Sequence, residues 1–269
     1  MSSRLKAVLS GYIKQAKSTW SLHSVLRTKS DENSLRPWER SLKDPTAYYL
    51  DCVRYFHSDQ FPSFLKKHRA YFRAQRRGFG EDAFHAMWWM LFQELRPERF
   101  LEIGVYRGQT LSLASLIQRE LSIGGSVVGI SPFTCSGDAV SSYREDIGYL
   151  ADTGRNFTFF GLPKPELVRS FSTDPAARAR IEANTWDAIY IDGNHDYGVA
   201  RSDWDLCAAN VSPNGVIVLD DAALGTAYKP PVFATAGHPG PSRVAEEVAG
   251  TSFREIIRVG HNRVFQRTE

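Results

Sequence analysis

The chain has 269 residues, of which 42% are hydrophobic and 23% are charged, as in an ordinary globular protein with one main domain. Its net charge of +3 is unevenly spread, because residues 1–100 hold 18 Lys and Arg against 10 Asp and Glu, whereas residues 101–269 hold 15 against 20. No apolar run reaches the ~20 residues that cross a bilayer, no secretory signal is evident, and three separated cysteines indicate neither a zinc site nor disulfides, so a cytoplasmic protein is expected.

The first part of the chain predicts helices. Residues 3–27 place Leu, Val, Ile and Trp among Lys and Arg at helical spacing, which indicates an amphipathic helix. Residues 28–45 are polar and contain Pro37 and Pro45, so this segment is the best candidate for a linker. We therefore expect an α-helical N-terminal extension over residues 1–95. Further helical patterns cover 46–57, 62–77 and 83–92, and the last of these is apolar enough for a buried helix.

The basic charge of this extension has more than one interpretation. Residues 62–77 interleave aromatic and basic side chains, as some nucleic-acid-binding surfaces do, and the first helix could lie on a membrane or contact an acidic partner. Lys and Arg on solvated helix faces are the usual explanation, and no recognition motif flanks them. A nucleic acid is therefore not the expected partner, whereas the N-terminal helices could pair two copies of the chain.

From Phe100 onward, apolar strands alternate with helical patterns, which is typical of βαβ units and a parallel sheet. A turn of Gly260, His261 and Asn262 joins the last two strands as an antiparallel hairpin. Residues 96–269 are thus expected to form an α/β domain with a doubly wound, mostly parallel, seven-stranded Rossmann-like sheet. The strands are expected at 100–103, 126–130, 157–160, 187–191, 215–219, 253–259 and 263–266.

Acidic residues follow two of these strands where each strand ends. Asp192 ends the strand at 187–191, and Asp220 with Asp221 ends the strand at 215–219. Neighbouring parallel strands bring such residues to one edge of the sheet, where ligands bind in open α/β folds. Three carboxylates repel one another unless a cation lies between them, and oxygen ligands suit Mg²⁺ or Ca²⁺. Capping of helix N-termini is the alternative explanation.

A glycine turn follows the first strand. Glu102 stands two residues before Gly104, and Gly108 precedes an amphipathic helical pattern. Gly104 permits a tight turn, and Gly108 lets a ligand approach the free N–H groups of a helix N-terminus. The acidic residue, the two glycines and their place after a first strand together predict a cofactor-binding turn.

These motifs resemble those of the class I S-adenosylmethionine (SAM)-dependent methyltransferases. Glu102, Gly104 and Gly108 match the family's first motif, and the succession of strands over about 100–269 follows the family. The segment IDGNHDY is followed by a helix, by P-x-G and by a strand that ends in Asp-Asp. This order is similar to that in the group that contains small-molecule and sugar O-methyltransferases, some of them Mg²⁺-dependent, and cephalosporin hydroxylase-like proteins. The resemblance implies that the glycines border the methionine part of the cofactor and that Glu102 supports the loop.

Two residues depart from the family pattern. The second strand ends at Ser131, where the family usually has an acid that binds the ribose hydroxyls, and a serine binds only one hydroxyl well and without charge. Asn194 stands where related sugar methyltransferases often carry a second acid, although an amide oxygen can still bind a hard cation. The change at Ser131 affects the cofactor-binding set, which the resemblance extends to Asp192, whereas the change at Asn194 affects cation binding.

The resemblance also implies catalytic roles. Metal-dependent relatives place metal ligands at the positions of Asp192, Asp220 and Asp221, and a divalent ion there lowers the pKa of the acceptor hydroxyl. His195 lies three residues beyond Asp192 and is the candidate general base. It could equally be a hydrogen-bonding support. Asp196 is an alternative ligand, base or helix cap. His238, in the Gly- and Pro-rich segment 223–242, could reach over the acceptor, but without a motif a structural role is the favoured expectation.

The sequence therefore predicts a SAM-dependent, Mg²⁺-dependent O-methyltransferase that acts on a hydroxyl of a sugar or another small molecule. Ser131 motivates an alternative, a methyltransferase-like module that binds a partner without turnover. The basic extension motivates a second alternative, a nucleic-acid methyltransferase, against which the absence of an amino-methylating motif counts. No G-x-S-x-G sequence supports a hydrolase.

Overall fold

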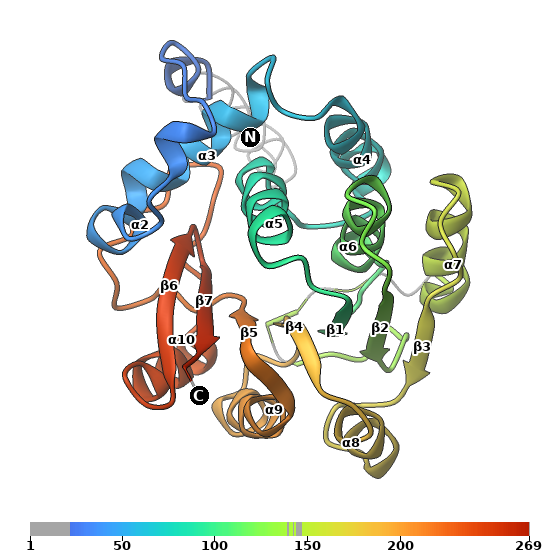
Figure 1. Cartoon of the computed structure of the whole chain (residues 1–269). Coiled ribbons are helices and arrows are strands. Elements are labelled where there is room, and N and C mark those ends of the chain that lie inside the picture. The colour runs from blue at the N-terminus through green and yellow to red at the C-terminus, as the bar shows by residue number, and fades with distance from the viewer. Residues whose placement is uncertain (1–21, 139, 142, 144–146, 269) are drawn as a thin grey trace, which may run out of the picture.

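The computed structural model describes residues 22–138, 140–141, 143 and 147–268. These residues form a seven-stranded sheet with the strand order β3-β2-β1-β4-β5-β7-β6 (Figure 1). Strands β1 to β5 are parallel to one another, and β7 is antiparallel to both β5 and β6. The predicted mostly parallel sheet with a terminal antiparallel hairpin is confirmed. The strands are β1 (Arg99–Ile103), β2 (Ser126–Ser131), β3 (Glu166–Arg169), β4 (Trp186–Ile191), β5 (Val211–Leu219), β6 (Phe253–Val259) and β7 (Asn262–Arg267).

Helices cover both faces of the sheet, with α5, α6 and α7 on one side and α8, α9 and α10 on the other (Figure 1). Successive strand residues point to opposite faces, so in β4 Tyr190 packs with the first group, while Ile189 and Ile191 pack with the second. The longer helices are α3 (Pro45–His57), α4 (Ser63–Arg73), α5 (Asp82–Leu95), α6 (Gln109–Glu120), α7 (Tyr149–Phe159), α8 (Pro175–Glu182), α9 (Tyr197–Asn210) and α10 (Pro239–Val248). Shorter turns are η1 (Asn33–Leu35), α2 (Arg40–Lys43) and η2 (Ala74–Arg76).

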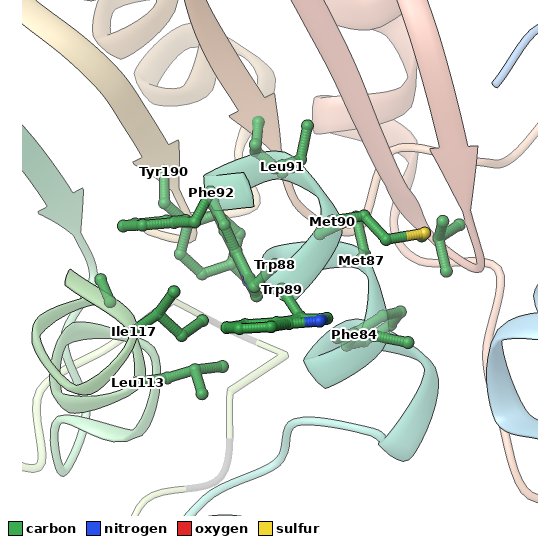
Figure 2. Packing of buried hydrophobic residues seen from close by; sticks show 14 of the residues in the cluster. Phe84, Met87, Trp88, Trp89, Met90, Leu91, Phe92, Leu113, Ile117 and Tyr190 are labelled. Atoms are coloured by element: carbon green, nitrogen blue, oxygen red, sulfur yellow. The ribbon is translucent and has the colours of Figure 1, made fainter. Parts of the chain in front are cut away.

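Helix α5 is the buried helix that its apolar sequence predicts. The ring of Trp88 packs edge-on against Phe100 of β1 at 5.5 Å and against Tyr190 of β4 at 5.4 Å between centroids. Figure 2 shows this aromatic face of α5 against Leu113 and Ile117 of α6. Large aromatic rings bury much apolar area, so α5 shares one core with the sheet. The boundary between an extension at 1–95 and a domain at 96–269 stays a prediction.

Two expectations about local structure are wrong. Residues 157–160 belong to the end of α7 and the turn after it, and the third strand is Glu166–Arg169. The segment expected to be a linker is packed, because Leu35 is fully buried and its carbonyl accepts a hydrogen bond from Tyr48. The predicted helix at 3–27 lies mostly outside the described residues. Within the part of the chain that is described, no helix is long and apolar enough to cross a membrane.

Two buried histidines join α4 to α5 and α6. His68 Nδ1 lies 3.1 Å from His85 Nε2, and His68 Nε2 lies 3.0 Å from Ser112 Oγ. Burial lowers the pKa of His85 to about 3 and, with the neighbouring His85, lowers the pKa of His68 well below its ordinary value. Both imidazoles are therefore neutral in the folded protein at neutral pH, and folding excludes the protons that they would bind when unfolded.

We expect this pair to make the protein sensitive to mild acid. A folded-state pKa below the unfolded value of 6.5 means that the stability is fully present above pH 6.5 and is lost as the pH falls below it. His85 alone should account for about 2 kcal/mol between pH 7 and pH 5. Urea unfolding at both pH values should show that the H85Q variant loses about 2 kcal/mol less than the parent chain. An equal loss in both proteins would contradict the assignment.

Candidate active site

The glycine turn after β1 packs directly against the end of β4. Gly104 has φ +93°, and a Cβ atom built on it would lie 1.7 Å from the carbonyl oxygen of Asp192. The Gly104 N–H donates to the carbonyl of Ile130 at 2.9 Å, and the Asp192 N–H donates to the carbonyl of Ile103 at 2.8 Å. The positive φ of Gly104 and its close approach to the Asp192 carbonyl both favour glycine, since only glycine combines the two without strain. The turn and Asp192 therefore lie at the same edge of the sheet.

Glu102 and Gly108 connect this turn to helix α6. The Glu102 carboxylate is buried and accepts a hydrogen bond from the backbone N–H of Leu111 in the first turn of α6, while its Oε2 atom has no hydrogen-bond partner. Burial raises the pKa of Glu102 well above its ordinary value. Gly108, with φ +79°, is the residue before α6 and provides no side chain over the helix N-terminus. These features fit the predicted support of a cofactor loop.

Side chains beside the turn hold it in place. Arg107 is buried, and its Nε donates to Asp152 of α7 at 2.5 Å. The Arg107 carbonyl accepts from the Asn156 amide at 2.8 Å, so Arg107 has a structural role at α7. Ser131 is the last residue of β2 and lies at the same sheet edge, because β2 pairs with β1 up to Ile130 opposite Ile103. The position expected for ribose recognition is thus next to the glycine turn.

The three predicted carboxylates come together after β4 and β5. The Asp220 N–H donates to the carbonyl of Ile191 at 3.0 Å, which aligns the end of β5 with the end of β4. Burial and the negative charges of Asp220 and Asp221 raise the pKa of Asp192 above its ordinary value. Burial also opposes ionisation of Asp220, but the charge of His261 lowers the pKa of Asp220 below its ordinary value. Asp192 therefore takes up a proton before Asp220 does.

His261, at the tip of the β6–β7 hairpin, joins this acidic group. Its Nε2 atom lies 3.2 Å from Asp220 Oδ1, and its Nδ1 atom lies 3.8 Å from Asp221 Oδ1. Burial disfavours the charged ring, but the Asp220 carboxylate, with Glu81 and Asp221, raises the pKa of His261 to about 10. The sequence showed His261 only as part of a hairpin turn. Its role depends on β7 lying beside β5, which no local motif reveals.

His195, the candidate base, lies between two carboxylates. Its Nδ1 atom is 2.6 Å from Asp138 Oδ2, and its Nε2 atom is 2.9 Å from Asp221 Oδ2. Asp138 Oδ2 also accepts the backbone N–H of His195 at 2.7 Å. Although burial disfavours the charged ring, these carboxylates raise the pKa of His195 above its ordinary value. Asp138 was not predicted, because it follows β2 without any motif and is brought to His195 only by the fold.

Of the residues near His195, His238 contacts the site directly, whereas Asn194 bonds to the backbone of the loop before α9 and Asp196 is exposed. The His238 ring lies 4.2 Å from the His195 ring, and its Nε2 is 3.9 Å from Asp221, so His238 belongs to the site, although it was expected to be structural. Asn194 uses its amide oxygen to accept the Asp196 N–H at 2.7 Å. Asp196 is the residue before α9, but its side chain makes no capping hydrogen bond.

Two groups of three side chains in the described residues have metal-binding spacing, with ligand atoms within 4.8 Å of one another. One contains His195, Asp221 and His238, and the other contains Asp220, Asp221 and His261. Both mix imidazole with carboxylate, whereas an all-oxygen set with Asp192 was predicted. Asp192 nevertheless lies close enough for its pKa to respond to both Asp220 and Asp221. The donors present therefore fit a divalent cation.

Residues 101–222, which contain the glycine turn, Asp192 and the Asp220–Asp221 pair, match the family model described as a methyltransferase domain. This segment is therefore similar to a methyltransferase domain. No curated protein sequence matches the chain significantly. The family resemblance seen in the sequence is confirmed for this methyltransferase domain, and its sheet has the Rossmann-like methyltransferase fold.

Solved structures share the fold of this chain at low sequence identity. The SAH-bound Podospora anserina methyltransferase PaMTH1 is 16% identical with a TM-score of 0.54, covering 78% of this chain and 89% of its own. The Bacillus cereus O-methyltransferase in complex with SAH is 17% identical with a TM-score of 0.53, and the match covers 78% of this chain and 93% of the Bacillus cereus chain. TomG from Streptomyces achromogenes, an O-methyltransferase of tomaymycin synthesis in complex with SAM, is 16% identical with a TM-score of 0.50, covering 76% and 89%.

Proposed function

We propose that the protein is a SAM-dependent O-methyltransferase that acts on a hydroxyl group of a sugar or another small molecule. The observation that carries this proposal is the shared sheet edge: the glycine turn packs on the backbone of Asp192, and His195 lies three residues further along. PaMTH1, the Bacillus cereus enzyme and TomG, whose structures contain SAH or SAM, have the same fold and support the choice of cofactor. The free cysteines of this chain favour the reducing cytoplasm as its location.

The proposed cofactor residues are Glu102, Gly104, Gly108, Ser131 and Asp192. When bound, SAM supplies a sulfonium methyl group that an oxygen nucleophile can displace in line. The unpartnered Glu102 Oε2 and the N-terminus of α6, where Gly108 provides no side-chain cap, are polar groups that such a ligand could satisfy. Ser131 would donate one neutral hydrogen bond to the ribose, so we expect weaker ribose binding than an acid gives.

His195 is the proposed general base. In the neutral ring, Asp138 accepts the Nδ1 proton and fixes the tautomer, so Nε2 is the atom that can take the proton of the acceptor hydroxyl. Asp221 lies 2.9 Å from Nε2 and would stabilise the imidazolium that forms. Asp138 is therefore a positioning residue, and its hydrogen bond to the backbone of His195 keeps both groups in register.

Asp192, Asp220 and Asp221 are the proposed ligands of a divalent ion, for which Mg²⁺ is expected from the sequence. Such an ion, when bound, lowers the pKa of the acceptor hydroxyl. Burial and the negative charges of Asp220 and Asp221 disfavour the ionisation of Asp192, and a bound cation would relieve this condition.

Removal of the metal tests this part of the proposal. Release of S-adenosylhomocysteine from SAM, measured over a panel of sugar and phenol hydroxyl acceptors, should stop in EDTA and return when Mg²⁺ is added in excess. The D220N and D221N variants should not recover at the Mg²⁺ concentration that restores the parent chain. D205N, on the exposed face of α9, is the matched control and should recover fully. Turnover that is insensitive to EDTA would show that the carboxylates are structural.

A further inference from the structure

We infer that the divalent-cation site at the end of β5 contains an imidazole nitrogen, Nε2 of His261, in addition to the carboxylates of Asp220 and Asp221. The ion is then a transition metal such as Mn²⁺, Co²⁺ or Zn²⁺, bound in preference to Mg²⁺. This inference rests on the divalent ion of the proposed function and changes its ligand set and its chemical class.

The first observation is the geometry between His261 and Asp220. Their facing atoms, Nε2 and Oδ1, form an ion pair at 3.2 Å, but the buried Asp220 Oδ1 has no well-aligned hydrogen bond. Two ligand atoms bound to one ion at about 2.1 Å, and at right angles to each other, are about 3 Å apart without bonding to each other. The pair therefore has the relation of two ligands of a common ion.

The second observation is the other nitrogen of the ring. His261 Nδ1 lies 3.3 Å from the backbone carbonyl of Thr235, which can only accept a hydrogen bond. When an ion displaces the proton that Asp220 favours at Nε2, the N–H at Nδ1 stays bonded to this carbonyl and the lone pair at Nε2 is on the side of Asp220. Metal-binding histidines generally donate their second nitrogen to a carbonyl or carboxylate in this way, which fixes the tautomer and the ring direction.

The surroundings hold the ring in this position before any ligand arrives. His261 is 7% exposed, and the Phe84 ring contacts it edge-on at 4.7 Å between centroids. The His261 carbonyl accepts the N–H of Ala222 at 2.8 Å, which ties the hairpin tip to the segment that carries Asp220 and Asp221. Rigid support of this kind is what a precise ligand set requires.

The third donor and the local charge complete the site. Asp220, Asp221 and His261 each offer a ligand atom within 4.8 Å of the other two. Asp221 Oδ1 lies 3.8 Å from His261 Nδ1, and Asp221 Oδ2 lies 2.9 Å from His195 Nε2. Asp221 can thus bind the ion while it contacts the proposed base. Glu81, which accepts a hydrogen bond from Tyr49, adds negative charge near His261. Imidazole combined with carboxylates suits Mn²⁺ to Zn²⁺ better than Mg²⁺, which prefers oxygen alone.

Mn²⁺ is the probe for the test, since it is paramagnetic and accepts both ligand types. Electron spin echo envelope modulation of Mn²⁺ bound to the full-length protein at pH 8 should show ¹⁴N coupling from a coordinated imidazole. H261A should lose this coupling and weaken Mn²⁺ binding at least about tenfold, whereas H238A should keep both. Labelling the histidines with ¹⁵N should replace the ¹⁴N coupling of the parent chain by a ¹⁵N coupling. This replacement identifies a histidine as the ligand without any substitution.

Each result is decisive. Coupling that survives in both H238A and H195A assigns the nitrogen to His261 even if H261A fails to fold. Bound Mn²⁺ without nitrogen coupling would show an all-oxygen ligand set, which overturns the inference and leaves the metal of the proposed function in place. Coupling that is lost in H238A or in H195A would place the ion in the other histidine group and also overturns it. If millimolar Mn²⁺ does not bind, both the inference and the proposed metal fail.

Discussion

Replacing His195 with alanine is expected to lower kcat about 10²- to 10⁴-fold, the usual contribution of a positioned general base. The substitution removes the atom, Nε2, that would take the proton of the acceptor, but it leaves the glycine turn and the strand ends unchanged. SAM affinity should therefore stay within about twofold of the parent value. The measurement is S-adenosylhomocysteine release at saturating SAM, with an acceptor from the panel that shows turnover.

Two further variants separate a base from a structural support. D138N should also lower kcat, because an amide at that position can donate to Nδ1 and so favours the wrong tautomer, while it keeps the shape of the site. H57A is the control, since His57 contacts Asp82 at the far end of α3 and has no part in the site. If H195A retains kcat within threefold of the parent chain, His195 is not the base.

Replacing Gly104 with alanine is expected to destabilise the fold by about 3 kcal/mol or more. The new Cβ would lie 1.7 Å from the carbonyl oxygen of Asp192 and 2.9 Å from the Gly193 nitrogen, and neither backbone atom can move without disturbing the end of β4. The positive φ of Gly104 adds strain for any residue with a side chain. Thermal unfolding should show a midpoint about 10 °C lower.

Gly154 provides the matched control for this substitution. It lies in α7, a Cβ built on it meets nothing within 4 Å, and alanine favours helix over glycine by about 1 kcal/mol. G154A should therefore be as stable as the parent chain or slightly more stable. A G104A protein with an unchanged midpoint would mean that the turn and β4 are further apart than the structure places them.

The parts of the fold that the sequence predicted are those with strong apolar signals. The strands that became β1, β2, β4 and β5 are largely buried on both faces, so most of their residues are apolar. The third strand was misplaced because β3 is at the edge of the sheet, where its four residues are exposed or half-buried and show no apolar run. Phe157 and Phe159 suggested a strand, but in α7 Phe157 is buried and Phe159 is exposed.

The site shows a similar division. Asp192, Asp220 and Asp221 follow strands directly and His195 comes three residues after Asp192, so the rule that parallel strands end at one edge was enough to bring them together. Asp138 and His261 were not predicted as site residues, because they come from a loop after β2 and from a hairpin tip, and only tertiary packing brings them to His195 and Asp220. Asp138 also distinguishes the two nitrogens of His195, because it contacts Nδ1.

Calorimetric titration with SAM tests the central claim most directly, because it needs no knowledge of the acceptor. Binding of one SAM per chain is expected in the parent protein, and G108V, which would press a side chain against Thr153 and strain the left-handed backbone of the turn, should weaken it strongly. G154A should bind as the parent chain does. No binding at millimolar SAM would contradict the assignment as a SAM-dependent methyltransferase and would favour a methyltransferase-like module without turnover.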